Sequence, residues 1–201
     1  MENENNLRHV YNFTDTFNMS PKFNEKISKS EYKNEDSRSR LAMAVKILPN
    51  IYLGDNRASQ SKTFFEKAEV TGVLNMTPNI SNAFSEFDNI EYLRIPVYDS
   101  HGKRDVNKMY QYFPIVTEFM YKVTVMENRN MLVHCALGRQ RSCAAIAAYL
   151  IKFYNMTPVD AMEFILKRKP DAFHWGESAN FAKSLNRWYY KLNPTERKVP
   201  M

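Results

Sequence analysis

Residues 131–142 read MLVHCALGRQRS, and this stretch decides how the rest of the chain is interpreted. The apolar residues 131–133 predict a buried strand, and the alanine-rich run after Ser142 predicts a helix. Between them, residues 134–142 fit the pattern H-C-x-x-G-x-x-R-S, which is typical of a tight loop that ends at a helix start. A strand, a loop and a helix start in this order form a ring of backbone N–H groups that binds a phosphate dianion.

A thiol at the base of such a ring has a specific chemistry. The field of the N–H groups lowers a thiol pKa, so we expect Cys135 to be a thiolate near neutral pH and to act as a nucleophile. Arg141 offers a planar guanidinium to two phosphate oxygens, and Gly138 lets the backbone approach the anion closely. The residues predicted to bind the substrate phosphate are Ala136, Leu137, Gly138, Arg139, Gln140 and Arg141.

The residues next to this loop are predicted to support the thiolate. The Ser142 hydroxyl can donate a hydrogen bond to the Cys135 sulfur and ease its departure, or it can cap the helix, and both roles stay open. His134 points away from the phosphate if the strand alternates. We interpret it as a group that orders the loop and helps to lower the pKa of Cys135, not as a base. Cys143 is interpreted as a small helix residue, with a redox partnership with Cys135 as the alternative.

The sequence on both sides predicts an α/β fold. Strands are expected at residues 46–48, 51–54, 70–76 and 90–97, and helices at residues 61–68, from 105 to 123, from 157, and up to 192. Pro114 is expected to kink the long helix, and Asp105 is expected to cap it. We predict one domain over residues 43–193, with a central, mainly parallel sheet of four or five strands and helices on both faces.

The ends of the chain and its composition suggest the setting. Residues 1–42 are polar and are interpreted as an N-terminal extension, either a disordered arm or one short docking helix, and a homodimer through it stays open. Residues 194–201 are interpreted as a C-terminal tail. No apolar stretch approaches the ~20 residues that span a bilayer, and no secretory signal is visible. Two cysteines, one of them a predicted catalytic thiol, favour a reducing compartment, which is the cytoplasm or else the nucleus. The net charge of +6 favours anionic partners.

The loop at residues 134–142 resembles the signature of the cysteine-dependent dual-specificity protein phosphatases. The similarity extends from about Ile47 to Leu192 and includes the stretches 49–54, 73–76, 95–99 and 148–151. The resemblance implies two-step hydrolysis of a phosphate monoester through a phosphocysteine, with no metal or other cofactor. The implied substrates are proteins that carry phosphotyrosine, phosphoserine or phosphothreonine.

The resemblance also implies a general acid and a bracing residue. Asp99 directly follows the segment at residues 95–97 and stands where the family carries its acid, which protonates the leaving group. Asp105 is the rival, but its place before the long helix favours a capping role. Asn75 resembles a family position that braces the phosphate loop by hydrogen bonds.

The same chemistry could also act on a phospholipid head group or on an RNA 5′ end. Arg139 resembles the basic residue of relatives that act on phospholipid head groups, although those relatives usually carry Lys where this chain has Ala136. Phosphatases of RNA 5′ ends differ at Leu137, Gln140 and Ser142, so nucleic acid is not expected as a partner.

A phospho-binding module without turnover and a Cys–His hydrolase are hypotheses from different functional classes. A binding module would usually have lost Cys135, Arg141 or Asp99, and this chain keeps all three. A Cys–His hydrolase would use His101 or His174 as its base.

Overall fold

The computed structural model describes residues 43–100, 102–173 and 181–196. The chain divides into two units, residues 1–34 and 35–201, and every described residue belongs to the second unit. The expected N-terminal extension, with its short helix and dimer contact, therefore lies outside the described residues. The same holds for His101, His174 and residues 197–201.

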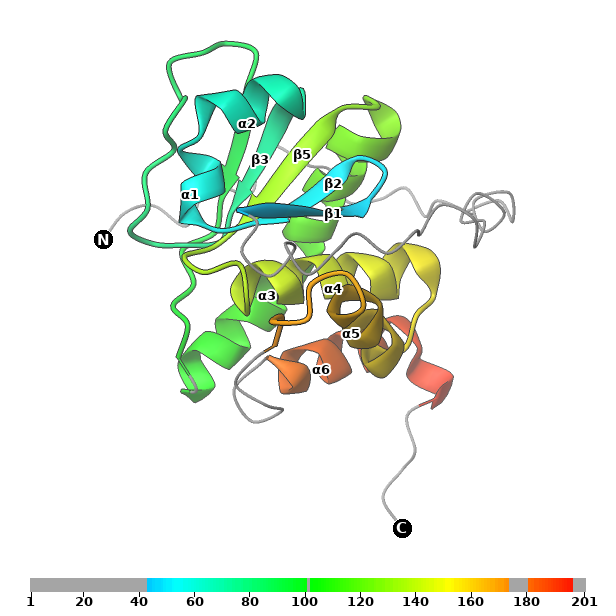
Figure 1. The fold of residues 1–201 in the computed structure, drawn as a ribbon. Coiled ribbons are helices and arrows are strands. Elements are labelled where there is room, and N and C mark those ends of the chain that lie inside the picture. The colour runs from blue at the N-terminus through cyan, green and yellow to red at the C-terminus, as the bar shows by residue number, and fades with distance from the viewer. Residues whose placement is uncertain (1–42, 101, 174–180, 197–201) are drawn as a thin grey trace. The chain divides into compact units, whose positions relative to one another are not determined.

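A five-stranded sheet lies at the centre of the second unit (Figure 1). In spatial order β1-β2-β5-β3-β4, its strands are β1 (Ala44–Leu48), β2 (Ile51–Gly54), β5 (Asn130–His134), β3 (Val70–Asn75) and β4 (Glu91–Arg94). The hairpin of β1 and β2, turned at Pro49 and Asn50, is antiparallel, and every other pairing is parallel. The prediction of a mainly parallel sheet with four or five strands is confirmed.

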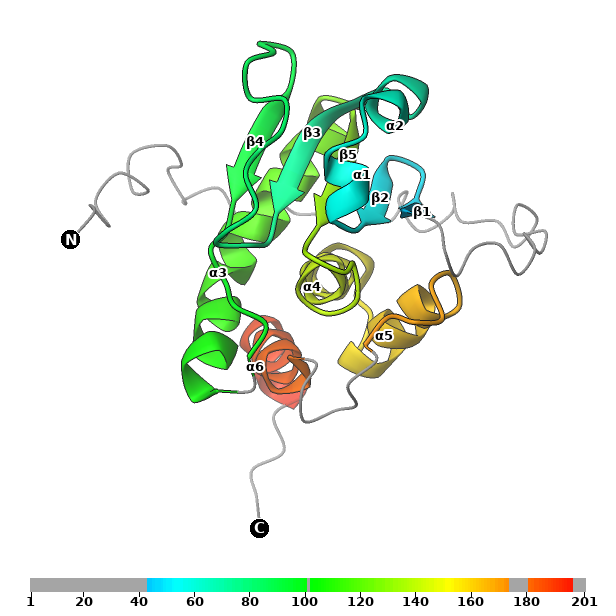
Figure 2. The ribbon, with the colours of Figure 1, turned by 60° about the vertical axis from the view of Figure 1, so that its left-hand side comes forward.

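Helices cover both faces of this sheet (Figures 1 and 2). The short helices α1 (Asn56–Ser59) and α2 (Lys62–Lys67) lie on one face, where Val73 and Leu132 pack against Phe65. On the other face Leu74 and Val133 join the larger core. Successive strand residues thus alternate between two apolar cores, as buried parallel strands require. The helices on this second side are α3 (Lys103–Tyr121), α4 (Arg141–Tyr154), α5 (Pro158–Leu166) and α6 (Ala182–Leu192).

The central helix is α4, which contacts α3, α5 and α6. It is buried from Arg141 to Ile151, as its alanine-rich sequence predicts. Trp188 of α6 donates a hydrogen bond from Nε1 to the Ala148 carbonyl at 3.1 Å. Trp188 is therefore part of the core, whereas Tyr190 on the same helix is exposed. Because α4 begins at the end of β5, this packing fixes the loop between them.

Helix starts follow the local sequence at two places. The Ser61 hydroxyl accepts from the Phe64 N–H and caps α2, and the Thr157 hydroxyl caps α5 with Pro158 as its first residue. After α6, Pro194–Glu196 form a 3₁₀ turn at the start of the expected tail. No helix among the described residues is long and apolar enough to cross a membrane.

The long helix α3 differs from its prediction at both ends. Gly102 is its N-cap, and Asp105 lies in the first turn, where its carboxylate accepts a hydrogen bond from the Ser100 hydroxyl. The prediction that Asp105 caps the helix is therefore wrong by three residues. The helix is continuous through Pro114 and ends in a π turn, η4 (Lys122–Met126), which the sequence pattern did not predict.

Candidate active site

The phosphate loop, residues 135–141, leaves the carboxyl end of β5 and runs into α4 (Figure 2). Backbone hydrogen bonds hold its start: the N–H of Met76, just after β3, donates to the carbonyl of His134 at the end of β5 at 2.9 Å, and the N–H of Asn56, the first residue of α1, donates to the Ala136 carbonyl at 3.1 Å. Gly138 has a φ of +66°, and a Cβ there would lie 2.7 Å from the Gly54 carbonyl oxygen. Only glycine satisfies both conditions, so Gly138 lets the loop pack closely against the end of β2.

The Cys135 thiol lies at the base of this loop and is 1% exposed. Burial raises the pKa of Cys135, but the Arg141 charge, the Ser142 hydroxyl and the backbone N–H groups of Ser142 and Gln140 outweigh it, so the pKa lies below its ordinary value. The Ser142 hydroxyl donates to Cys135 Sγ at 3.3 Å. Ser142 is the second residue of α4, behind the N-cap Gln140, so the hydroxyl supports the sulfur and does not cap the helix.

His134 is buried behind the nucleophile and is neutral at physiological pH. Burial lowers the pKa of His134 to about 4, although a hydrogen bond with the Cys135 backbone and the nearby Asp55 carboxylate favour its protonated form. A neutral imidazole adds no positive charge to the site. The groups that lower the pKa of Cys135 are Arg141 and the hydrogen-bond donors from Ser142 and Gln140, and the supporting role of His134 stays a prediction.

Arg141 joins the phosphate loop to the segment that follows β4. Its Nη1 donates to the Val97 carbonyl at 3.2 Å and to the Met76 carbonyl at 3.5 Å, and the side chain is buried. Its Nε lies 3.6 Å from Oδ2 of Asp99, whose side chain is 31% exposed. Asp105, by contrast, is buried and bound by Ser100. The structure therefore brings Asp99, and not Asp105, beside Arg141.

The outer residues of the phosphate loop differ in exposure. Leu137 is 58% exposed, Ala136 is half-buried, and Gln140 is buried. The Arg139 side chain is 38% exposed, and its Nε donates to Oδ2 of Asp171 at 2.9 Å. Sequence reasoning missed Asp171. It lies 32 residues further along the chain in the segment after α5, where no local pattern indicates its partner.

Asn75 does not brace the phosphate loop through its side chain. Its amide Nδ2 donates to the Ile80 carbonyl at 2.8 Å and to Asn82 Oδ1 at 3.0 Å, and its Oδ1 accepts from the backbone and hydroxyl of Thr77. The residue thus orders the turn after β3. This corrects the role that the resemblance implied: the side chain of Asn75 bonds within its own turn, and the backbone N–H of neighbouring Met76 donates to the His134 carbonyl at the end of β5.

The second cysteine supports the loop from within α4. The Cys143 thiol donates to the Gly138 carbonyl at 3.4 Å, and burial raises the pKa of Cys143 well above its ordinary value. Cys143 therefore stays protonated where Cys135 ionises. Both cysteines are free thiols.

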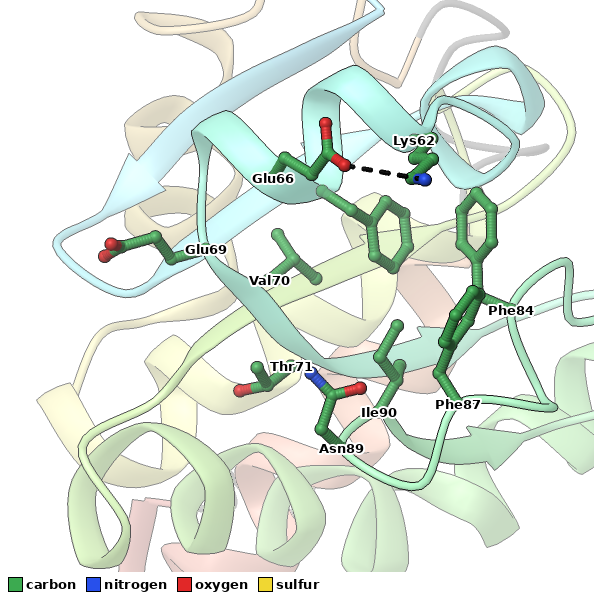
Figure 3. Close-up of a pocket in the computed structure, with 10 residues that line it drawn as sticks. Lys62, Glu66, Glu69, Val70, Thr71, Phe84, Phe87, Asn89 and Ile90 are labelled. Atoms are coloured by element: carbon green, nitrogen blue, oxygen red, sulfur yellow. Dashed lines mark ion pairs between the residues drawn. The ribbon is translucent and has the colours of Figure 1, made fainter.

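A pocket of about 320 Å³ lies away from these residues (Figure 3). Val70, Thr71 and Ile90 line it at the amino ends of β3 and β4, opposite the sheet edge that carries the phosphate loop. Phe65, Phe84 and Phe87 also line it, and Lys62 and Glu66, which form an ion pair, are among its lining residues (Figure 3). None of the predicted site residues lines this pocket.

Comparison with known proteins agrees with the geometry of the loop. Residues 51–191 match the family described as dual specificity phosphatase, catalytic domain. The chain belongs to this family. Human dual specificity protein phosphatase 9 is 31% identical to it over 150 residues, and human dual specificity protein phosphatase 6 is 29% identical over 168 residues. These matches cover 73% and 82% of this dual specificity phosphatase chain but only 38% and 42% of the two relatives.

Two solved structures share this fold. Human DUSP28 superposes with a TM-score of 0.65 at 22% identity, over 76% of this chain and 96% of that one. PTPMT1, solved in complex with PI(5)P, superposes with a TM-score of 0.61 at 21% identity, over 77% and 99% of the two chains. At these identities the likeness concerns the fold alone.

Proposed function

We propose that this dual specificity phosphatase hydrolyses phosphotyrosine and phosphoserine or phosphothreonine in proteins through a phosphocysteine intermediate. The observation that carries the proposal is one cluster of side chains, in which Cys135, Arg141 and Ser142 are buried and Asp99 is 31% exposed. Cys135 accepts a hydrogen bond from Ser142, has a lowered pKa, and shares the phosphate loop with Arg141, which lies beside Asp99. The cluster holds a nucleophile, an anion-binding guanidinium and a carboxyl group, which are the parts that phosphate ester cleavage needs.

In the first step the Cys135 thiolate attacks phosphorus, and the bond from phosphorus to the substrate oxygen breaks. The backbone N–H groups of the phosphate loop and the Arg141 guanidinium hold the other three phosphate oxygens as their charge spreads. The Asp99 carboxyl group donates its proton to the leaving oxygen, so the dephosphorylated side chain departs neutral.

In the second step water attacks the phosphocysteine. Asp99, now a carboxylate, accepts the proton of the water, and the bond between sulfur and phosphorus breaks. The Ser142 hydroxyl, 3.3 Å from the sulfur, stabilises the departing thiolate by its hydrogen bond. Inorganic phosphate leaves, and the site again holds the Cys135 thiolate and the protonated Asp99 carboxyl group.

Two observations support protein substrates: the names of the relatives, and an apolar side chain that is exposed on the phosphate loop. Both human relatives are dual specificity protein phosphatases. Leu137 at the mouth is apolar and exposed, which suits contact with a peptide around the phosphate. Because a catalytic thiolate requires a reducing environment, we place the protein in the cytoplasm or nucleus.

The test measures phosphate release from peptides that carry one phosphotyrosine or one phosphothreonine, with the full chain. Cys135→Ser should abolish turnover, because a serine hydroxyl is not ionised at neutral pH. The matched control Cys143→Ser removes the protonated thiol and should keep most of the activity. Acid quenching of the wild type should trap phosphate on Cys135, as read by mass spectrometry.

Three outcomes would contradict the proposal. Turnover above about 1% of wild type in Cys135→Ser would exclude the covalent route. Faster turnover of a phosphoinositide, or of a 5′-phosphorylated RNA, than of both peptides would overturn the assignment of protein substrates. Binding of the phosphopeptides without any phosphate release would indicate a phospho-binding module.

A further inference from the structure

Arg139, at the mouth of the phosphate loop, is attached twice to the segment that follows α5. Its side chain donates from Nε to Asp171 Oδ2 at 2.9 Å, and its backbone carbonyl accepts from the Phe173 N–H at 2.7 Å. The guanidinium of Arg139 is thus held by the protein itself, although its side chain is 38% exposed.

Asp171 is in turn fixed by a second cation. Its Oδ1 accepts from Lys169 Nζ at 2.5 Å, and Lys169 is 6% exposed. Burial raises the pKa of Asp171, but Lys169 and Arg139 outweigh it and hold the pKa below its ordinary value, so the carboxylate is ionised at neutral pH. One carboxylate therefore serves two cations and offsets part of the positive charge at the mouth.

We propose that Asp171 determines substrate specificity by holding the Arg139 side chain at the open side of the phosphate loop. As a result, the phosphatase prefers a peptide with a single phosphorylated residue to a peptide that carries a second phosphate close by. This proposal rests on the proposed function. An unpaired arginine binds phosphate through two parallel hydrogen bonds. In this chain the Nε is already bound to a carboxylate, and the neighbouring Leu137 is apolar and 58% exposed. A second phosphate next to the first would therefore meet Arg139, whose charge Asp171 already balances, and the apolar side chain of Leu137.

The experiment compares two peptides of one sequence, the first phosphorylated on a single tyrosine and the second also on a threonine two residues away. The measured quantity is the ratio of kcat/KM for the doubly phosphorylated peptide to that for the singly phosphorylated peptide. Asp171→Asn should raise this ratio about threefold or more at low salt, the range of an exposed ion pair. The rise should shrink as salt increases, because exposed charges are screened.

Two further variants show whether Arg139 causes the increase in the kcat/KM ratio. Adding Arg139→Gln to Asp171→Asn should cancel it. Glu163→Gln, which removes an exposed carboxylate from the neighbouring helix α5, should leave the ratio at the wild-type value. A purely structural role of Asp171 would lower both rates together and would not change the ratio.

An unchanged or lower ratio in Asp171→Asn would overturn the proposal. If that variant does not fold because the buried Lys169 is left without its partner, Lys169→Met/Asp171→Asn removes both charges and should show the same rise. The ratio of the two equilibrium affinities, which needs no turnover, should rise in the same way in Asp171→Asn. A failure to hydrolyse either peptide would therefore contradict the proposed function and still leave this inference tested.

Discussion

At the scale of single residues, Arg141 does two things with one side chain. Its Nη1 binds the carbonyls of Val97 and Met76, and its Nε lies beside Asp99. Its charge also lowers the pKa of Cys135. The guanidinium therefore contacts the segment that carries Asp99 and also lowers the pKa of the Cys135 thiol.

Replacement of this arginine by lysine should not preserve activity. Arg141→Lys keeps the charge, but a single ammonium cannot bind the Val97 carbonyl and two phosphate oxygens at once. We expect kcat for a phosphotyrosine peptide to fall at least ~100-fold, the scale of one preorganised donor. Arg139→Lys is the control on the rim, with a smaller loss. Equal losses in the two variants would show that Arg141 does not hold the substrate phosphate.

Variants of Asp99 and Asp105 should differ in how strongly their hydrolysis rates depend on the leaving group of the substrate. Asp99→Asn should slow phosphopeptide hydrolysis on the order of 100-fold, because the leaving oxygen loses its proton donor. The loss should be much smaller for an aryl phosphate whose leaving group is a weak base. Asp105→Asn should change both rates little, since an amide oxygen can still accept from Ser100. If the two variants exchange behaviour in steady-state kinetics, the acid is Asp105.

At the scale of elements, the strand, loop and helix at residues 130–154 could be predicted because their signals are local. An apolar strand, the H-C-x-x-G-x-x-R-S pattern and an alanine-rich helix follow one another, so Cys135, Arg141 and Ser142 come together without long-range information. The Asp171 contact with Arg139 could not be predicted, because it depends on how α5 packs. The Asp105 cap was wrong because Gly102 starts the helix earlier.

The close packing of the phosphate loop on β2 predicts a cost for any side chain at Gly138. Gly138→Ala places a Cβ 2.7 Å from the Gly54 carbonyl oxygen at a φ of +66°. We expect a loss of about 1–3 kcal/mol in the free energy of unfolding and at least a ~10-fold loss of kcat, because the loop must shift. The measurements are denaturant unfolding and steady-state kinetics.

Gly102→Ala is the matched control for this prediction. Its φ is −66°, and among the described residues a Cβ there would meet only the Ser100 hydroxyl, at 3.4 Å. Stability and kcat should stay close to wild type. If Gly138→Ala behaved like Gly102→Ala, the close approach of the loop to β2 would not matter for function.

At the scale of the whole molecule, the buried neutral imidazole of His134 links folding to pH. The pKa of His134 is lowered from 6.5 to about 4 in the folded chain, so the unfolded chain binds more protons between these values. The free energy of unfolding should therefore fall as the pH drops from 6.5 toward 4, by about 1.4 kcal/mol per pH unit at most. His134→Gln should flatten this slope in urea titrations. An equally steep slope in the variant would assign the pH effect to other groups.

The difference in ionisation between the two buried thiols allows the active molecules in a sample to be counted. Cys135 has a lowered pKa in an anion-binding loop, whereas Cys143 is held protonated against the Gly138 carbonyl. Iodoacetate, an anion that alkylates thiolates, should label one of the two sulfurs in the native state and the other only after denaturation. The stoichiometry of native labelling would then report the active fraction of any preparation, without knowledge of the physiological substrate.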